Sequence, residues 1–388
     1  MRDITIIGTL PPLKGISPYC EALVNSLSKS AKINFISFRK IYPEFLYPGG
    51  TKHSGIADFN PKLSQVEVRE IITYYNPLSW ISAALAVKGS IFHVQWWAHV
   101  LAPIYFVILS IAKIRGKKIV ITVHNVSAHE NNVITRLFNK AVLILGDRYI
   151  VHSISNKKAL RKEYGIIEEL IEVVPHGVLE PMEYTNISRE DARAYLQIPQ
   201  NKKVLLHFGT IRDYKGIDIL LEAMAELRKN VPEIILLIAG KPWENWEKYE
   251  QIIKQNNLEA FVIKRLDFIP PNEIEYFYAA SDLLILPYKY FNSQSGVGAQ
   301  ALAFRKPMIV TKVGGLPEYV RNEQAIAKPN DKTELASKIA EILTNPQLYN
   351  ELVKNMETIR NEYAWDKIAQ RTIEVYERAL FDKNAVQR

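Results

Sequence analysis

Residues 207–227 read HFGTIRDYKGIDILLEAMAEL, and their pattern decides the fold. An apolar run ends at Phe208 and a Gly-Thr pair follows it. From about Gly216, apolar residues recur at helical spacing, at positions 219, 220, 223, 224 and 227. This order predicts a buried strand, a tight turn and an amphipathic helix. Such a unit is the building block of a parallel α/β sheet.

Two cations lie in the loop between this strand and this helix. Arg212 and Lys215 come after the carboxyl end of the strand and just before the helix N-terminus. Backbone N–H groups and the helix dipole attract anions at such a position, and cationic side chains add to them. The loop therefore favours a diphosphate ligand. Two surface cations on a tight turn are the competing interpretation.

The rest of the chain alternates in the same way. Strands are predicted at residues 4–7, 33–38, 91–94, 118–123 and 149–152, and again at 204–208, 233–239, 261–267, 282–286 and 308–311. Helices are predicted at 18–27, 98–114 and 156–163, and from about residues 216, 245, 272, 300 and 331. Two such series predict two doubly wound α/β domains with ligands at the carboxyl ends of the strands. A cleft between the domains is then the expected site.

A polar segment, residues 180–191, separates the two series. Within it, Ser188 and Asp191 form a capping-box pattern that predicts a helix through Leu196. We therefore expect a first domain of residues 1–185 and a second of residues 186–364. Two domains also agree with the length of 388 residues, which exceeds what one hydrophobic core usually supports.

Cysteine content and hydropathy indicate a protein of the cytoplasm. Cys20 is the single cysteine, which excludes a disulfide framework and a cysteine-based metal site. The first residues lack the long apolar core of a signal peptide. The longest apolar run, residues 100–112, is shorter than the ~20 residues that span a bilayer. We expect a cytoplasmic protein, with peripheral contact to the inner face of the membrane as the alternative.

The net charge of +8 and the pI of about 9.2 favour anionic partners. Two basic clusters contribute to it: Lys113, Arg115, Lys117 and Lys118, then Lys157, Lys158, Arg161 and Lys162. Nucleic acid is not expected, because zinc-finger spacing and an RNP-like aromatic pattern are both missing. The apolar helix 98–114, preceded by Trp96 and Trp97, suits a lipid-linked acceptor at an anionic membrane. A core helix that ends in ordinary solvated lysines is the alternative.

The stretch that begins at His207 resembles the Gly-Arg-x-x-x-x-Lys-Gly signature of retaining glycosyltransferases of family 4, which have the GT-B fold. Here Thr210 and Ile211 separate Gly209 from Arg212. Further matches follow in the order of the family: PPLKGISPYCEAL (11–23), TVHN (122–125), VPHGV (174–178), AASDLLILPY (279–288) and KPMIVTKVGGLPEYV (306–320). The resemblance implies two Rossmann-like domains that face each other across a cleft. It also implies that the C-terminal helix, residues 365–388, packs back on the first, acceptor-side domain.

The resemblance also implies a role for each matching residue. Arg212 and Lys215 would neutralise the departing nucleoside diphosphate, after the turn at Gly209. Gly15 would let its loop pass close to the donor phosphates or the acceptor, and His124 would contact the donor sugar. Glu318 would lie near the nucleotide. A structural histidine is the alternative for His124, and an ordinary first-turn carboxylate is the alternative for Glu318.

One loop departs from the family pattern. Family 4 enzymes usually carry two glutamates, separated by seven residues, where this chain reads FNSQSGVGAQALAFRKP (291–307). Counting back from the end of the loop places Gln300 and Asn292 at the two positions. A one-residue deletion would place Ser293 at the first of them and Gly296 at the family's glycine, next to Ser295. The amide of Gln300 can still form a hydrogen bond with a ribose hydroxyl. The absence of a carboxylate on the sugar side, which would balance positive charge on the reacting sugar, has three possible explanations.

The three explanations are a variant loop that uses its own polar groups, a narrow donor range, and sugar-nucleotide binding without transfer. We favour the first, because Arg212, Lys215, His124 and Gly15 remain together. The sequence thus predicts a retaining glycosyltransferase that moves a hexose from a UDP- or GDP-sugar to a glycan, lipid-linked or small-molecule acceptor. A non-catalytic nucleotide-sugar-binding protein and a nucleotide-sugar epimerase of the same fold are the alternatives. A phosphorylase is disfavoured, because no pyridoxal-phosphate lysine site is recognisable.

The predicted reaction is front-face displacement without a tightly bound cofactor. No Asp-x-Asp pattern suited to a metal-bridged diphosphate is present, so cations and helix dipoles are expected to replace a metal ion. The nucleotide sugar is thus the one small-molecule partner predicted besides the acceptor.

Overall fold

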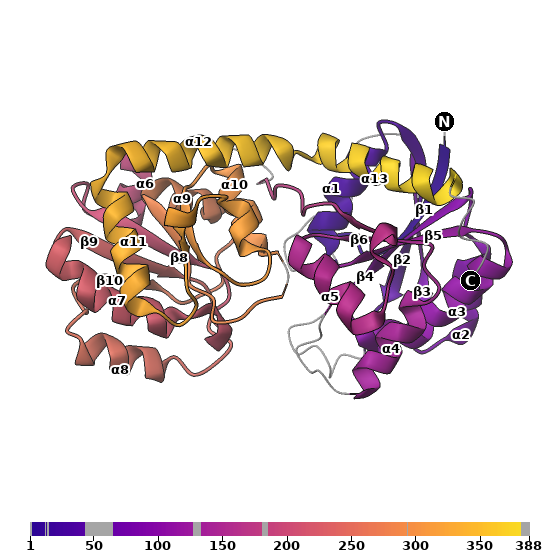
Figure 1. Cartoon of the computed structure of the whole chain (residues 1–388), viewed down its shortest axis with the longest axis horizontal. Helices are drawn as coiled ribbons and strands as arrows, with labels where there is room; N and C mark the ends of the chain where they lie inside the picture. The colour runs from indigo at the N-terminus through magenta and orange to yellow at the C-terminus, as the bar shows by residue number, and fades with distance from the viewer. Residues whose placement is uncertain are drawn as a thin grey trace. The chain divides into compact units, whose positions relative to one another are not determined.

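The computed structural model describes residues 2–11, 13, 15–42, 65–126, 133–180, 185–292 and 294–381. The chain divides into two compact units (Figure 1). The first unit comprises residues 1–177 together with 363–388, and the second comprises residues 178–362. The sequence placed the corresponding boundaries at 185/186 and 364/365.

The first unit contains a seven-stranded parallel sheet. Its strands are β1 (Arg2–Ile7), β2 (Ala31–Lys40), β3 (Val66–Thr73), β4 (Ile91–Trp96), β5 (Lys118–Val123), β6 (Arg148–Val151) and β7 (Ile171–Val173). They lie in the order β3-β2-β1-β4-β5-β6-β7, so the strand order reverses between β1 and β4. The helices are α1 (Ser17–Leu27), α2 (Pro77–Leu85), α3 (Ala102–Ile114), α4 (Val133–Leu143), α5 (Ile154–Tyr164) and α13 (Trp365–Phe381).

Hydrophobic clusters cover both faces of this sheet. On one face, side chains of α2 and α3 pack on the strands, with Ala84, Ile108 and Leu109 buried among them. On the other face, α13 packs beside α1, and Ile368 and Tyr376 share a buried cluster with α1 residues. The last helix of the chain therefore belongs to the first unit (Figure 1).

The second unit contains a six-stranded parallel sheet in the order β10-β9-β8-β11-β12-β13. Its strands are β8 (Lys203–Phe208), β9 (Ile234–Ala239), β10 (Val262–Arg265), β11 (Leu283–Leu286), β12 (Met308–Thr311) and β13 (Ile326–Ala327). Its helices are α6 (Arg189–Leu196), α7 (Ile217–Asn230), α8 (Glu247–Gln255), α9 (Ile274–Ala280), α10 (Gly296–Ala303), α11 (Lys332–Thr344) and α12 (Pro346–Glu362). The strand order reverses between β8 and β11.

The two parallel sheets confirm the predicted pair of doubly wound α/β units. The capping box is also confirmed, because Ser188 Oγ accepts a hydrogen bond from Asp191 N at 3.0 Å and begins α6. The predicted start of a helix near Gln300 was wrong. Helix α10 begins at Gly296, because the side chain of Ser295 caps it. The sequence also missed β3, β7, β13, α2 and α4.

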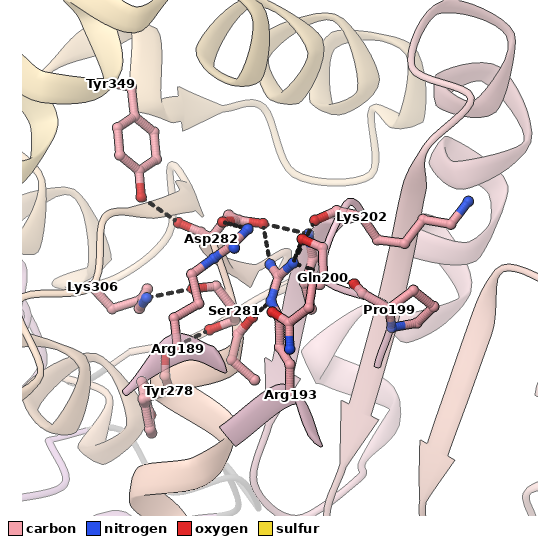
Figure 2. Close-up of polar contacts among 12 residues, drawn as sticks. Arg189, Arg193, Pro199, Gln200, Lys202, Tyr278, Ser281, Asp282, Lys306 and Tyr349 are labelled. Carbon is pink, nitrogen blue, oxygen red and sulfur yellow. Dashed lines mark hydrogen bonds and ion pairs between the residues drawn. The ribbon is translucent and has the colours of Figure 1, made fainter. Parts of the chain in front are cut away.

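A buried guanidinium organises the amino-terminal edge of the second sheet (Figure 2). The side chain of Arg193, on α6, is 0% exposed. Its Nε and Nη1 atoms donate to backbone carbonyls of Ala280, Gln200 and Lys202 at 2.9, 2.7 and 2.8 Å. These bonds tie α6 to the segments that lead into β8 and β11.

Asp282 completes this arrangement. Its Oδ2 accepts from Arg193 Nη2 at 2.9 Å and from Val204 N at 2.7 Å, while its own N–H donates to Val204 O at 2.8 Å. One carboxylate thus holds the first residues of β8 and β11 together. Arg189 pairs with the same carboxylate at 3.3 Å, but its side chain is 40% exposed.

Replacing Arg193 with Met should lower the free energy of unfolding by about 3–5 kcal/mol, because it leaves Asp282 and the carbonyls without their buried cation. Replacing Arg189 with Met is the matched control and should cost no more than about 1 kcal/mol, since its pair is solvent-exposed. Urea denaturation measures both. Equal losses in the two variants would contradict the role assigned to burial.

Candidate functional site

The candidate site of the second unit lies at the carboxyl edge of its sheet. In open parallel sheets, ligands bind where the strand order reverses, because the loops after the two flanking strands diverge there. Here those strands are β8 and β11. The loop after β8 carries Arg212 and Lys215, and the loop after β11 leads into α10. The structure therefore brings the predicted phosphate loop and the predicted sugar loop to one switch point.

Lys215 is a buried cation without a carboxylate. It ends the short turn Asp213–Lys215, and its residue is 6% exposed. Burial, and secondarily the charge of Arg212, lower the pKa of its ammonium to about 8. Its Nζ lies 5.9 Å from the centroid of the Tyr288 ring. Within the part of the chain that the structure describes, no acid forms an ion pair with it, and a desolvated cation of this kind is stabilised by an anionic partner.

Two glycines let the β8 loop reach this position. Gly209 has a φ of +92°, and a Cβ on it would lie 3.0 Å from Val297 Cγ2 and 3.1 Å from Lys215 Nζ. Gly216 has a φ of +69°, and its Cβ would lie 2.0 Å from the carbonyl oxygen of Pro287. A side chain at residue 216 would overlap backbone, and one at residue 209 would be strained by the positive φ and crowded. Gly209 thus lies between the ammonium of Lys215 and Val297 in the first turn of α10, whose leading N–H groups have no intrahelical acceptor.

Arg212 is held on the same loop by an aromatic ring. Its guanidinium carbon lies 4.2 Å from the centroid of the Trp243 ring, in cation–π geometry. The backbone here is paired with the segment after β9: Ile211 N donates to Lys241 O at 3.0 Å, and Trp243 N donates to Ile211 O at 3.1 Å. Trp243 is 60% exposed, so the pair lies at the surface of the unit.

The loop before α10 is built around Ser295. Its Oγ accepts from Gly298 N at 3.4 Å and lies 3.1 Å from the Tyr288 hydroxyl, while Tyr319 Oη donates to its carbonyl at 2.9 Å. The hydroxyl of Ser295 thus caps α10 and is buried. The sequence assigned it to donor binding, which stays a prediction.

The other predicted residues of this region lie nearby along the chain. Gln300 lies on α10, where its Oε1 accepts from Tyr278 Oη at 3.2 Å. Asn292 and Gly296 are exposed. Glu318 is half-buried in the single turn Leu316–Tyr319, and Ser293 lies outside the described residues.

In the first unit, His124 belongs to a buried chain of polar side chains at the carboxyl edge of the sheet. Its Nε2 lies 2.9 Å from Gln95 Oε1, and its Nδ1 lies 3.2 Å from His152 Nε2. His152 Nδ1 lies 3.0 Å from the carbonyl oxygen of Val174. At the other end, the Gln95 amide lies 3.1 Å from His93 Nε2, whose Nδ1 lies 2.6 Å from Tyr376 Oη.

These imidazoles are neutral at neutral pH. Burial is the largest cause and the neighbouring histidines add to it: the pKa of His93 and of His152 falls to about 3, and that of His124 falls well below 6.5. Burial also lowers the pKa of His176, whose ring packs edge-on to Tyr19 at 5.0 Å. Tyr19 contacts His124 in the same way, at 4.8 Å.

Counting protons along this chain determines the tautomer of His124. The Val174 carbonyl can only accept, so His152 donates from Nδ1 and accepts at Nε2 from His124 Nδ1. A neutral His124 then has a lone pair at Nε2, and it can accept a hydrogen bond there only if the amide nitrogen of Gln95 faces it. If the amide oxygen of Gln95 faces Nε2 instead, the hydrogen bonds form only when either His124 or His152 carries a second proton. Burial favours the neutral arrangement, in which both ring nitrogens of His124 are engaged inside the unit.

Gly15 follows β1 with a φ of +95°, and it is exposed. A Cβ there would have no other atom within 4 Å, so backbone conformation, rather than crowding, favours glycine. Its contact with phosphates or acceptor stays a prediction, as does the contact of His124 with a sugar.

Most of the first basic cluster bonds within the unit, which favours the alternative of a core helix. Lys113 pairs with Asp147 at 2.8 Å. Arg115 Nη1 donates to Ala84 O at 2.6 Å, and Lys117 Nζ donates to Gly89 O at 2.5 Å. Helix α3 is a core helix, and Trp96 before it is 1% exposed. In the described ranges no helix has both the length and the apolar character needed to cross a bilayer.

Sequence reasoning missed the partners of His124. His93 and Gln95 alternate with apolar residues in FHVQW, and alternate residues of a strand share one face. Two polar residues on one face of a buried strand signal a polar network. Trp243 and Tyr288, which contact the two cations, carried no comparable signal. Across the described residues, no group of three or more His, Cys, Asp or Glu side chains is arranged to hold a metal ion.

Stability should fall when the pH drops below about 6.5. The unfolded histidines take up protons there, whereas the folded His93 and His152 stay neutral until about pH 3, so acid favours the unfolded chain. Calorimetry from pH 7.5 to 4.5 should show a falling Tm. The His93→Gln and His152→Gln variants, each compared with its own Tm at pH 7.5, should show a shallower slope. An unchanged slope in both variants would contradict neutral burial of the rings.

Comparison with known proteins agrees with this arrangement. A family model described as "Glycosyltransferase Family 4" matches residues 59–179, and one described as "Glycosyl transferases group 1" matches residues 188–358. Among relatives, D-inositol 3-phosphate glycosyltransferase of Rhodococcus erythropolis is 28% identical over 250 residues, 63% of this chain and 56% of that protein. Lipopolysaccharide 1,2-N-acetylglucosaminetransferase of Salmonella typhimurium is 26% identical over 221 residues, 55% of this chain and 58% of that protein. Each match spans little more than half of the relative.

Solved structures share the fold over the whole chain. Sucrose-phosphate synthase of Thermosynechococcus elongatus has a TM-score of 0.71 at 19% identity, with 99% of this chain and 100% of that chain covered. Anabaena Alr3699/HepE in complex with UDP also has a TM-score of 0.71 at 19% identity, with 97% and 100% covered. At this identity the likeness establishes the fold alone.

Proposed function

Because the chain belongs to the glycosyltransferases of family 4, with the GT-B fold, we propose that it transfers a hexose from a nucleoside-diphosphate sugar to an acceptor. The observation that carries the proposal is the buried ammonium of Lys215, which pairs with no acid among the described residues and lies at the switch point of the second sheet. Such a cation is stabilised by an anionic ligand. A glycan, a small molecule or a lipid-linked sugar is the proposed acceptor.

The diphosphate of the donor is proposed to lie between the β8 loop and α10. Lys215 and Arg212 supply two positive charges, and the first N–H groups of α10 add a partial one. These charges stabilise the diphosphate as it leaves, which is the task that a metal ion performs in other transferases. The binding of UDP by Anabaena Alr3699/HepE supports the nucleotide part of this proposal.

The proposed reaction is a front-face displacement that retains the anomeric configuration. The bond between the anomeric carbon and the diphosphate oxygen breaks, the acceptor oxygen bonds the same face of that carbon, and the acceptor proton passes to the diphosphate. No protein nucleophile and no metal ion take part. Lys215 and Arg212 are the residues that lower the barrier, since charge builds on the leaving diphosphate.

The α10 loop is proposed to hold ribose and sugar in place of the usual glutamates. Tyr278 donates to Gln300 Oε1, which leaves the amide nitrogen of Gln300 to donate to a ribose oxygen. Ser295 acts by capping α10, and Asn292, Ser293 and Gly296 supply the polar groups of the turn. Glu318 is proposed to approach the nucleotide from the neighbouring turn.

A binding protein without transfer activity is the second candidate, because Asn292 and Gln300 replace both carboxylates of the family loop. An epimerase of the same fold is the third. Radiolabelled nucleotide sugars separate the three candidates. Transfer gives a labelled acceptor, epimerisation releases nucleoside diphosphate without any acceptor, and a binding protein leaves the donor unchanged.

Replacing Lys215 with Met should weaken the binding of nucleoside diphosphates by about 10–100-fold, because one charge-assisted contact is lost. Calorimetric titration with UDP, GDP and ADP measures this and also identifies the base. Binding to the unaltered protein should weaken as the pH rises through about 8, where the ammonium loses its proton. Lys241→Met is the control, because that lysine is exposed on the adjacent loop. Equal weakening in both variants would refute the assigned contact.

The transfer product should have the anomeric configuration of the donor sugar, and it should form in the presence of EDTA. Front-face displacement predicts the first result, and charge stabilisation by side chains predicts the second. Proton NMR of the product formed in EDTA reports both. An inverted product would exclude the proposed mechanism, and loss of turnover that added Mg²⁺ restores would exclude metal independence.

A further inference from the structure

Helix α4 exposes the more apolar of its two faces. Val133, Ile134 and Leu137 are 73%, 63% and 60% exposed, Phe138 is 39% exposed, and Ile144, just beyond the helix end, is 69% exposed. Helix positions separated by three or four residues share a face, so these side chains form one continuous stripe. Soluble proteins seldom expose contiguous apolar surface of this kind without a partner.

The buried face of the same helix is less apolar. It consists of Thr135, Asn139, Val142 and Leu143. Asn139 Nδ2 donates to Tyr164 Oη at 2.8 Å, which fixes α4 against α5 (Figure 1). An amphipathic helix normally turns its apolar stripe to the core. The reversed placement indicates that the exposed stripe of α4 has a function outside the core of this unit.

Cations border the stripe. Arg136 and Lys140 are exposed on α4, and the segment 133–144 contains no acidic residue. On α5, Lys158 and Lys162 are exposed and Lys157 is half-exposed, and the described residues offer none of these five cations an ion pair. Three nearby acids lie on or after these helices: Glu163 is half-buried on α5, Asp147 pairs with Lys113, and Glu168 pairs with Arg161. The apolar stripe thus has cations on its own helix, and α5, which α4 contacts through Tyr164, carries three more.

We propose that α4, with the lysines of α5, docks the protein on the surface of an anionic lipid membrane. The apolar stripe would enter the interface between headgroups and acyl chains, and the cations would contact anionic headgroups. A second copy of this chain is disfavoured as the occupant, because it would bring the same cations against these. This surface differs from the one that the sequence suggested, since α3 buries one face in the core of the unit and the lysine and arginine that end it bond within the unit. The proposal does not depend on the transferase activity.

Co-sedimentation with vesicles tests the proposal on the full chain. The protein should bind vesicles of phosphatidylcholine mixed with phosphatidylglycerol, and it should bind pure phosphatidylcholine much more weakly. Binding should weaken as salt rises from about 50 to 500 mM, because counterions screen the headgroups. The double variant Leu137→Ser/Phe138→Ser should lose about tenfold or more in vesicle affinity. The Arg136→Gln/Lys140→Gln variant should lose most of its preference for anionic lipid.

The matched control is Leu78→Ser/Leu85→Ser on α2, where the two leucines are 74% and 59% exposed on the same unit. This variant should bind vesicles like the unaltered protein, and the thermal transitions of all variants should match, since every substituted side chain is partly or fully exposed. Absence of binding to anionic vesicles at low salt would overturn the proposal. So would equal losses in the α2 and α4 leucine variants. A concentration-dependent dimer abolished by Leu137→Ser/Phe138→Ser would also overturn it and identify a second copy as the occupant.

Discussion

The carboxylate of Asp282 is the constraint on which the candidate site depends. It bonds Val204 at the start of β8 and lies itself one residue before β11, so it sets the spacing of the two strands that flank the switch point. The fully buried Arg193 neutralises it and ties α6 to the same edge (Figure 2). Strands rise about 3.3 Å per residue and bend little over this length. The clamp at their amino ends therefore determines how their carboxyl ends present Lys215 and the α10 loop.

At the opposite edge, the same unit holds a buried cation that no acid among its described residues neutralises. Arg193 bonds carbonyls and a carboxylate, whereas Lys215 Nζ lies beside Gly209 and 5.9 Å from the centroid of the Tyr288 ring. Both charges are desolvated, yet only the first is compensated. An uncompensated charge destabilises the empty unit and stabilises a complex with an anion, because the ligand supplies the missing partner. Both edges of the sheet thus use a buried cation: Arg193 pairs with a carboxylate of the unit itself, and Lys215 is available to an anionic ligand.

Local pattern predicted ten of the 13 strands of the two sheets and the cation loop, because these follow from hydrophobic periodicity and from turn residues. Local pattern failed for elements and bonds that depend on contacts between distant parts of the chain. Strand β3 reads VEVREIIT, with charges that fit a partly exposed edge strand as well as a loop. Helix α10 begins with Gly-Val-Gly, which has poor helix propensity, and the cap of Ser295 compensates for it. The hydrogen bond between His93 and Tyr376 joins residues that are 283 positions apart, so no local pattern predicts it. Helix α4 was not predicted, and its sequence alone does not show which of its faces meets the core.

The two carboxyl edges also differ in charge, and the difference fits the separate roles proposed for them. The edge of the second unit offers cations and helix N–H groups to an anion. The edge of the first unit offers His124 as a neutral ring whose two nitrogens are held by Gln95 and His152. A sugar that loses its diphosphate develops positive charge at the anomeric carbon, and an imidazolium beside it would oppose that charge. For the sugar contact that the resemblance implies, burial of the histidine chain would matter because it lowers the pKa of His124 well below 6.5 and so keeps the ring uncharged at neutral pH.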